Sequence, residues 1–190
     1  MSKKLIAIVT SIALITAALV SCGSSPKATK ASTIIGKEGV PQPEWVNKMP
    51  KNPDIYYAVG YGKMSNKSNS IMRAEADAKD QIARWITTSV KNALTNYTND
   101  SGSDTNRQVL DSMESISKQV SDQSLVGVER DEVWVDQEGA VYVLCSFPKG
   151  NIGKSFDEVA QSFERNEAAA FADFKREEAL KFLDQETSKE

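Results

Sequence analysis

The sequence predicts an α+β fold, in which a small, mainly antiparallel sheet carries helices packed on one face. Three observations lead to this prediction. A short segment rich in aromatic and β-branched residues precedes a long apolar repeat of helical spacing, a strand–turn–strand pattern follows later, and a last helical repeat ends the chain. The resulting order is β-α-α-β-β-α, and separate runs of strands and helices are typical of α+β domains.

The first strand is expected at residues 55–62, where tyrosine, valine and isoleucine are followed by glycine. A helix is predicted after it, with Ser70 as the N-cap and an end within residues 98–102. Its apolar residues recur at steps near three and four and should form one buried stripe: Ile71, Ala74, Ala78, Ile82, Trp85, Val90, Leu94 and Tyr97.

A second helix is predicted from the spacing of Val109, Met113, Ile116 and Val120, with Asp104 or Thr105 as its cap. Its opposite side is polar, so its packing face should be narrow. Residues 96–108 could instead form a long, loosely ordered loop.

Residues 125–135 and 140–147 are predicted to be two strands joined by a turn at 136–139. A last helix is expected from about residue 152 to residue 183, with a phenylalanine-rich inner side and a charged end that frays after Arg176. This helix could dock a partner or a second copy of the chain, although packing in the core is the preferred interpretation.

The N-terminus has the pattern of an export signal. Lys3 and Lys4 precede an apolar run that extends from residue 5 to residue 20, and this combination is typical of a secretory signal. The run is shorter than the ~20 residues that a membrane-spanning helix needs. A plain secreted protein, or an uncleaved N-terminal anchor with Cys22 incidental, is the alternative.

Leu19, Val20, Ser21 and Cys22 resemble the bacterial lipobox, in which the signal is cleaved before an acylated cysteine. We therefore expect a signal peptide at residues 1–21, the acylated Cys22 with a flexible tether over residues 22–40, and a single domain over residues 41–190. Signal peptidase would recognise Leu19, Val20 and Ser21. About 150 residues suffice for one domain with its own core.

Composition excludes several classes of function. The chain has 23 basic and 26 acidic residues, and removal of Lys3 and Lys4 with the signal lowers the net charge from −3 to −5. This balance argues against nucleic acid as a partner. The sequence has no histidine, so it lacks the commonest general base and zinc ligand. Cys145 has no partner for a disulfide once Cys22 is acylated, and we expect it to be a small, buried, apolar side chain.

Three local patterns could carry chemistry or binding. Glu75, Asp77 and Asp80 could serve a carboxylate-only hydrolase, although a solvated helix face is the preferred interpretation. Residues 60–62 (Gly-Tyr-Gly) precede a helix as in a phosphate loop, but they lack the further glycine and the lysine of such motifs. Four aromatic residues could form an exposed patch for glycan or peptide, or be partly buried in the core: Trp45, Tyr56, Tyr57 and Tyr61.

Four blocks of the sequence suggest a family. They are residues 43–46 (Pro-Glu-Trp-Val), residues 57–62 (Tyr-Ala-Val-Gly-Tyr-Gly), the alanine-rich stretch 74–84 and the hairpin 132–144. In this order and spacing they resemble the bacterial Lpp-twenty lipoprotein family, whose fold is related to the N-terminal domain of flagellar assembly protein T. The resemblance implies an envelope lipoprotein, periplasmic or surface-exposed, without assigned catalysis.

We therefore expect a non-enzymatic, lipid-anchored binding or structural module of the bacterial envelope, without cofactor, metal or small-molecule substrate. Its partners would be the membrane, through acyl chains on Cys22, and an envelope protein or a second copy. The alternative is an accessory factor for flagellar assembly or for peptidoglycan-synthase activation. Gly23 and Ser24 follow the cysteine, and no aspartate occupies the position after it. In diderm bacteria that sort lipoproteins by this position, its absence favours export to the outer membrane.

Overall fold

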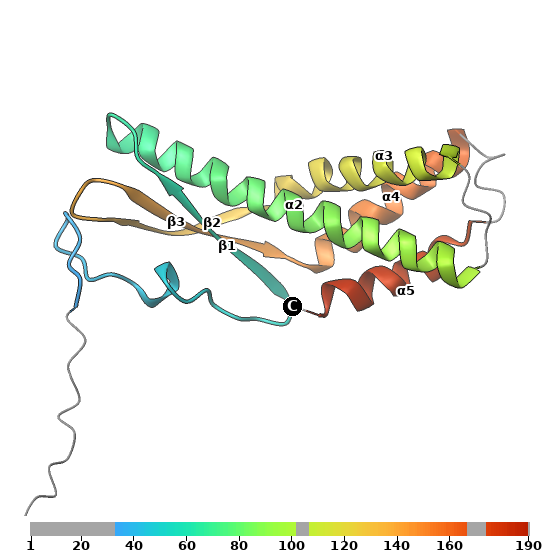
Figure 1. Ribbon diagram of the computed structural model, residues 1–190, viewed down its shortest axis with the longest axis horizontal. Coiled ribbons are helices and arrows are strands. Elements are labelled where there is room, and N and C mark those ends of the chain that lie inside the picture. Colours follow the sequence, from blue (N-terminus) through green and yellow to red (C-terminus); the bar gives the residue numbers. More distant parts are fainter. Residues whose placement is uncertain (1–32, 102–106, 167–173, 190) are drawn as a thin grey trace, which may run out of the picture. The chain divides into compact units, whose positions relative to one another are not determined.

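The computed structural model of the chain describes residues 33–101, 107–166 and 174–189 (Figure 1). The predicted signal peptide, Cys22 and the proposed caps Asp104 and Thr105 lie outside these ranges. The elements follow in chain order: η1 (Glu44–Val46), β1 (Ile55–Gly62), α2 (Lys67–Ser101), α3 (Arg107–Ser124), η2 (Leu125–Gly127), β2 (Glu129–Val135), β3 (Val141–Pro148), α4 (Gly150–Asn166) and α5 (Arg176–Thr187).

The predicted α+β fold is confirmed. The three strands form one antiparallel sheet in the order β1-β3-β2, so β3 lies at the centre and pairs with both neighbours. The four α-helices lie on the inner side of the sheet and beyond its end, with α2 running along both regions (Figure 1). The first half of α2 packs on β1 and β3, and its second half packs against α3 and α5.

The helix α2 begins earlier than the sequence predicted, at Lys67. Asn66, rather than Ser70, caps its N-terminus, because Asn66 Oδ1 accepts the N–H of Asn69 at 2.9 Å. Ser70 lies inside the helix, where its hydroxyl donates to the carbonyl of Asn66 and accepts the N–H of Met64. Its end at Ser101 lies within the predicted range of residues 98–102.

The segment 96–108 is not a long loop, because α2 and α3 occupy both of its ends. Ile116 and Val120 of α3 are fully buried and Met113 nearly so, as the predicted stripe requires. The helix also contacts its neighbour through a polar group, since the hydroxyl of Ser121 donates to the Ala83 carbonyl of α2 at 3.1 Å. The predicted strand 125–135 is shorter than expected, because its first residues form the 3-10 turn η2.

The prediction of one final helix from residue 152 to residue 183 is wrong. Helix α4 ends at Asn166 and α5 begins at Arg176, with residues 174 and 175 outside any helix. The end beyond Arg176 does not lie free as a frayed tail, since Ala179 and Leu183 are buried in the core. The hydroxyl of Tyr97 accepts the N–H of Lys175 at 2.8 Å and thereby ties the start of α5 to α2.

Part of the outer face of the sheet is covered by the chain that precedes β1. Residues 34–42 form a small hairpin, in which the N–H of Gly36 donates to the carbonyl of Val40 at 2.8 Å. Gly39 in its turn has a positive φ of 76°. The hairpin docks closely, because a Cβ at Gly36 would lie 2.2 Å from the Val135 carbonyl oxygen. Residues 34–40, which the sequence analysis assigned to the tether, are therefore part of the packed structure.

Candidate functional site

The residues predicted to carry lipidation cannot be placed in space. Cys22 and the recognition residues Leu19, Val20 and Ser21 precede the described ranges, so the structure neither brings them together nor separates them. Their assignment continues to depend on the sequence motif alone. The other predicted site residues lie within the described ranges.

The outer face of the sheet carries a compact aromatic cluster. Trp45 of η1, Trp134 of β2 and Leu144 of β3 are buried together there. The indole N–H of Trp45 donates to Glu132 Oε2 at 2.8 Å, and that of Trp134 donates to the carbonyl of Val40 at 3.1 Å. Trp45 therefore docks on the domain and holds the segment before β1 against the sheet.

The four aromatic residues proposed as one patch lie on two faces. Tyr56 points to the inner side, where its ring stacks on Trp85 at a centroid distance of 4.0 Å. Tyr57 and Tyr61 point outward, and Tyr61 meets Tyr142 edge-on at 5.4 Å. Alternation along β1 separates Tyr56 from its neighbours, because successive side chains of a strand face opposite sides.

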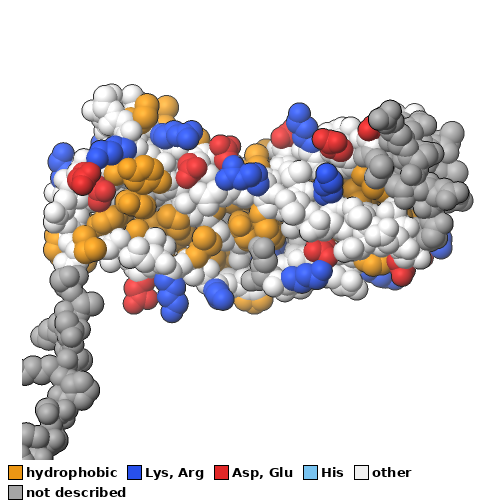
Figure 2. Space-filling model, viewed as in Figure 1, with side chains coloured by type: hydrophobic (Ala, Val, Ile, Leu, Met, Phe, Trp, Pro, Cys, Tyr) orange, Lys and Arg blue, Asp and Glu red, His pale blue; other side chains and the backbone are white. Residues whose placement is uncertain are grey.

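Part of the outer face remains open. Tyr61 is 46 % exposed, while Tyr57, Val59 and Tyr142 are half-buried beside it. Hydrophobic side chains gather over the sheet end of the domain (Figure 2). A half-exposed aromatic surface of this kind can bind another protein, since tyrosine supplies a large contact area and a hydroxyl.

The three carboxylates of α2 have separate structural partners. Glu75 pairs with Lys79 at 2.8 Å and with Arg130 of β2 at 3.2 Å. The hydrogen bond from Lys79 lowers the pKa of Glu75, and Arg130 adds to this effect against the opposing effect of burial. Asp80 is exposed, and within the described ranges it forms no ion pair with Arg84.

Asp77 covers the free edge of β1. Its Oδ2 accepts the N–H of Tyr61 at 3.1 Å, and Gln81 donates to the carbonyl of Val59 at 2.9 Å and to Asp77 at 3.2 Å. Because an edge strand presents unpaired backbone groups that can recruit another strand, these side chains protect β1 from further pairing. The sequence showed a carboxylate on a helix face, but the pairing with β1 required the tertiary structure.

The glycines of residues 60–62 serve helix packing. A Cβ at Gly60 would lie 1.9 Å from the Ala74 carbonyl oxygen, and one at Gly62 would lie 2.2 Å from that of Ser70. Both glycines lie within β1. They therefore allow α2 to approach the strand, and they do not form the turn that a phosphate loop needs.

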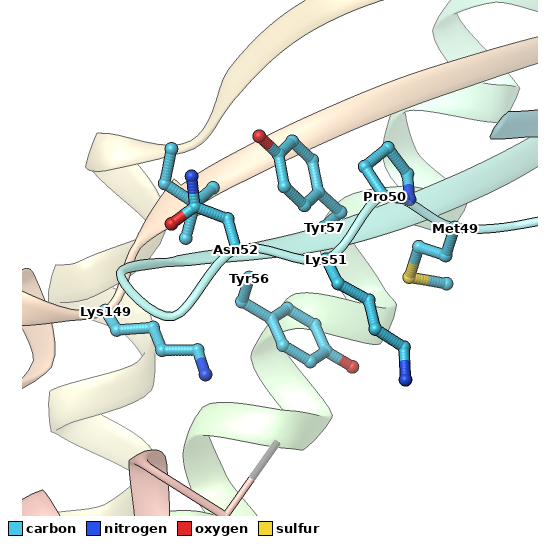
Figure 3. Close-up of a pocket in the computed structure, with 8 residues that line it drawn as sticks. Met49, Pro50, Lys51, Asn52, Tyr56, Tyr57 and Lys149 are labelled. Carbon is cyan, nitrogen blue, oxygen red and sulfur yellow. The ribbon is translucent and has the colours of Figure 1, made fainter.

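A small cavity of ≈ 240 Å³ lies beside the start of β1 (Figure 3). Its lining includes Lys51, Tyr56 and Lys149, whose side chains lie on one side of the strand, whereas Tyr57 lies on the other. Two lysines and a tyrosine ring thus contribute to its walls. Its walls also include Met49, Pro50, Asn52 and Ile55.

Lys149 is a residue whose role the sequence did not indicate. Its side chain is almost fully buried, with 8 % of the residue exposed. The ammonium donates to the carbonyl of Thr187 at 2.9 Å and lies 5.9 Å from the centre of the Trp85 ring. A cation at the C-terminus of a helix is favourable, so Lys149 stabilises the end of α5 against β3.

Cys145 lies in the centre of β3 and is fully buried, as predicted. Burial raises the pKa of its thiol to about 11, with a further contribution from the charge of Glu75. A thiol of this pKa is protonated at neutral pH and is a poor nucleophile.

The described part of the chain contains no group of three or more His, Cys, Asp or Glu side chains placed to hold a metal ion. Within residues 33–101, 107–166 and 174–189, no helix has both the length and the apolar character that a bilayer crossing needs.

The fold defines a class of α+β proteins in which a long helix packs on a three-stranded antiparallel sheet whose outer face is partly covered by the preceding chain. The chain belongs to the LPP20 lipoprotein family, since the model of that family, described as LPP20 lipoprotein, matches residues 43–147. This match confirms the resemblance seen in the sequence and places the protein among lipoproteins of the cell envelope. No curated protein and no solved structure matches the chain significantly.

Proposed function

We propose that this protein is a lipid-anchored module of the bacterial envelope, held to a membrane by acyl chains on Cys22. The observation that carries this proposal is the Leu-Val-Ser-Cys sequence at residues 19–22, directly after an apolar run, in a chain of a lipoprotein family. Burial of acyl carbons contributes about 0.8 kcal/mol per CH₂, and two or more chains hold a protein stably on a membrane.

The domain acts by binding rather than by catalysis. Glu75 pairs with Lys79 and Arg130, and Asp77 accepts a backbone N–H at the edge of β1. Both carboxylates therefore have structural roles. The outer-face surface of Tyr57, Tyr61 and Tyr142 supports contact with an envelope protein. Such a surface is apolar at its centre and carries hydroxyl groups that can pair at its edge.

The substitution Cys22→Ala tests the anchor. The variant should accumulate without acyl chains and leave the membrane pellet, whereas Cys145→Ala, which removes the other thiol, should stay in the pellet. Intact-mass measurement of both proteins reports the acyl groups directly. The proposal would be refuted if Cys22→Ala stayed in the pellet and its mass differed from that of the native protein only by the substitution. Density-gradient separation of inner and outer membranes then tests export to the outer membrane.

A second candidate function is an accessory role in flagellar assembly or in activation of a peptidoglycan synthase. It is supported by what the family resemblance implies, a fold related to the N-terminal domain of flagellar assembly protein T. A photo-crosslinking amino acid at position 61 in living cells, with position 91 on the exposed side of α2 as the matched control, distinguishes the candidates. Machine subunits captured at position 61 support the accessory role, while capture of other envelope proteins supports the general binding module.

A further inference from the structure

We propose that the end of the domain next to the tether rests on the lipid surface through an apolar rim. The rim is Ile34, Ile35 and Val40 of the N-terminal hairpin and Met64 of the loop between β1 and α2. This inference depends on the proposed anchoring at Cys22. It assigns to the folded domain a lipid contact of its own, in addition to that of the acyl chains.

The rim side chains are exposed although the backbone that carries them is fixed. Ile34 is 51 % exposed, Ile35 40 %, Val40 50 % and Met64 53 %. The hairpin is closed by the bond from the Gln42 N–H to the Ile34 carbonyl at 2.7 Å. Gln137 donates to the Ile35 carbonyl at 3.0 Å and so attaches the hairpin to the turn between β2 and β3. The exposure is therefore a property of the folded domain.

Ion pairs bring the parts of the rim together. Lys67 at the start of α2 pairs with Glu38 of the hairpin. Lys63, the neighbour of Met64, pairs with Glu138 of the β2–β3 turn at 2.7 Å. The hairpin, the β1–α2 loop and this turn lie at the same end of the domain (Figure 1).

The charges at this end balance, and this decides the kind of lipid contact. The two ion pairs neutralise four of the charged groups, so the rim does not present the basic cluster that attracts anionic headgroups. Aliphatic side chains can instead insert at the boundary between headgroups and acyl chains. The contact should therefore form on neutral lipid and resist salt.

Chain length places the rim near the membrane. Only eleven residue steps separate Cys22 from Thr33, where the described structure begins. Even a fully extended chain of this length spans at most about 40 Å. The hairpin is thus the first described element of the chain after the proposed anchor. A protein partner is less suited to this surface, because protein hot spots are rich in Trp, Tyr and Arg, and the rim has none of these.

The test uses the lipidated full-length protein reconstituted in phosphatidylcholine vesicles. A polarity-sensitive fluorophore is attached at Ile35→Cys or, as the matched control, at Val126→Cys, which is 89 % exposed at the other end of β2. A quencher on the lipid chains should reduce emission at position 35 about twofold and leave position 126 unchanged. Iodide, which quenches from the water, should reduce emission at position 126 and have little effect at position 35. The result should persist at about 1 M salt, where the Debye length is ~3 Å.

A second set of variants shows which side chains are responsible. Ile34→Ser with Val40→Ser should make the label at position 35 roughly tenfold more accessible to iodide, because two half-exposed aliphatic side chains no longer favour insertion. Val126→Ser, which removes an exposed apolar side chain elsewhere, should have no effect. Circular dichroism should show that both variants keep the fold.

Three outcomes would overturn the inference. In vesicle-bound protein, equal iodide quenching at positions 35 and 126 would show that the rim stays in water, and would leave the anchor intact. Shielding of position 35 in native envelopes but not in pure lipid vesicles would show that a protein covers the rim. Protein that fails to bind vesicles would contradict both the inference and the proposed anchor.

Discussion

Gly60 of β1 lies directly beneath the backbone of Ala74 of α2, so close that a Cβ at position 60 would be 1.9 Å from the Ala74 carbonyl oxygen. The contact is made by backbone atoms, which cannot move aside as a flexible side chain can. The separation between helix and sheet is therefore set by the absence of a side chain at this position. Ala74 and Ala78, both fully buried, complete the close approach from the helix side.

The substitution Gly60→Ala should destabilise the domain by roughly 2–4 kcal/mol, since α2 would have to move away from the sheet and lose buried contacts. Urea unfolding followed by circular dichroism measures this change. Gly153→Ala in α4 is the matched control, because no heavy atom lies within 4 Å of a Cβ there. It should stabilise the protein by about 0.5–1 kcal/mol. Equal effects of the two substitutions would contradict the close-packing role.

Removal of the buried ammonium in Lys149→Met should loosen α5, because the Thr187 carbonyl loses its donor while the aliphatic stem is retained. A loss of about 1–3 kcal/mol is expected for a buried hydrogen bond to a charged group. Amide hydrogen exchange should accelerate most in residues 176–187. Lys154→Met, at an exposed position of α4, should leave exchange in α5 unchanged. Unaltered protection of α5 in Lys149→Met would show that its capping role is wrong.

The substitution Glu75→Gln should change how stability depends on pH. The hydrogen bond from Lys79 lowers the pKa of Glu75 below its ordinary value of 4.5. A lowered pKa stabilises the folded protein above the unfolded pKa, and this contribution is lost as the pH falls through the folded pKa. The native protein should thus exceed the variant in stability by up to about 1 kcal/mol at pH 7, because the pair is partly exposed. The difference should vanish in acid.

The matched comparison for Glu75 is Asp80→Asn, which removes an exposed carboxylate from the same helix. Its effect on stability at pH 7 should lie within about 0.5 kcal/mol of zero. Thermal unfolding at several pH values between neutrality and strong acid measures both variants. A Glu75→Gln curve parallel to that of the native protein would exclude the pairing of Glu75 across α2 and β2.

The Cys145 thiol should be unreactive in the folded protein. Its pKa is raised to about 11 and the side chain is fully buried, so both thiolate formation and access are suppressed. In a Cys22→Ser background, a thiol reagent at pH 8 should modify Cys145 only after denaturant is added. The raised pKa also stabilises the fold below pH 9, and this contribution decreases as the pH rises from about 9 towards 11. Rapid native-state labelling would contradict this prediction.

Local patterns in the sequence were sufficient to predict the sheet strands, both helices after the first strand and the α+β class. The predicted strand 140–147 corresponds to β3, in which Val141, Val143, Cys145 and Phe147 alternate onto one buried face because successive side chains of a strand point to opposite sides. The boundaries were less accurate. Asn66, rather than Ser70, starts α2 because cap choice depends on which side chain can reach the free N–H groups.

The sequence by itself determined the family and the class of fold, and it supplied the motif at Cys22 on which the proposed anchor rests. Tertiary structure decided the rest: the division of the last helix into α4 and α5, the partial covering of the outer sheet face by residues 34–46, and the roles of Asp77 and Lys149. These features join residues far apart in the chain. Periodicity reports which side of an element is buried, whereas only the folded chain shows what lies against that side.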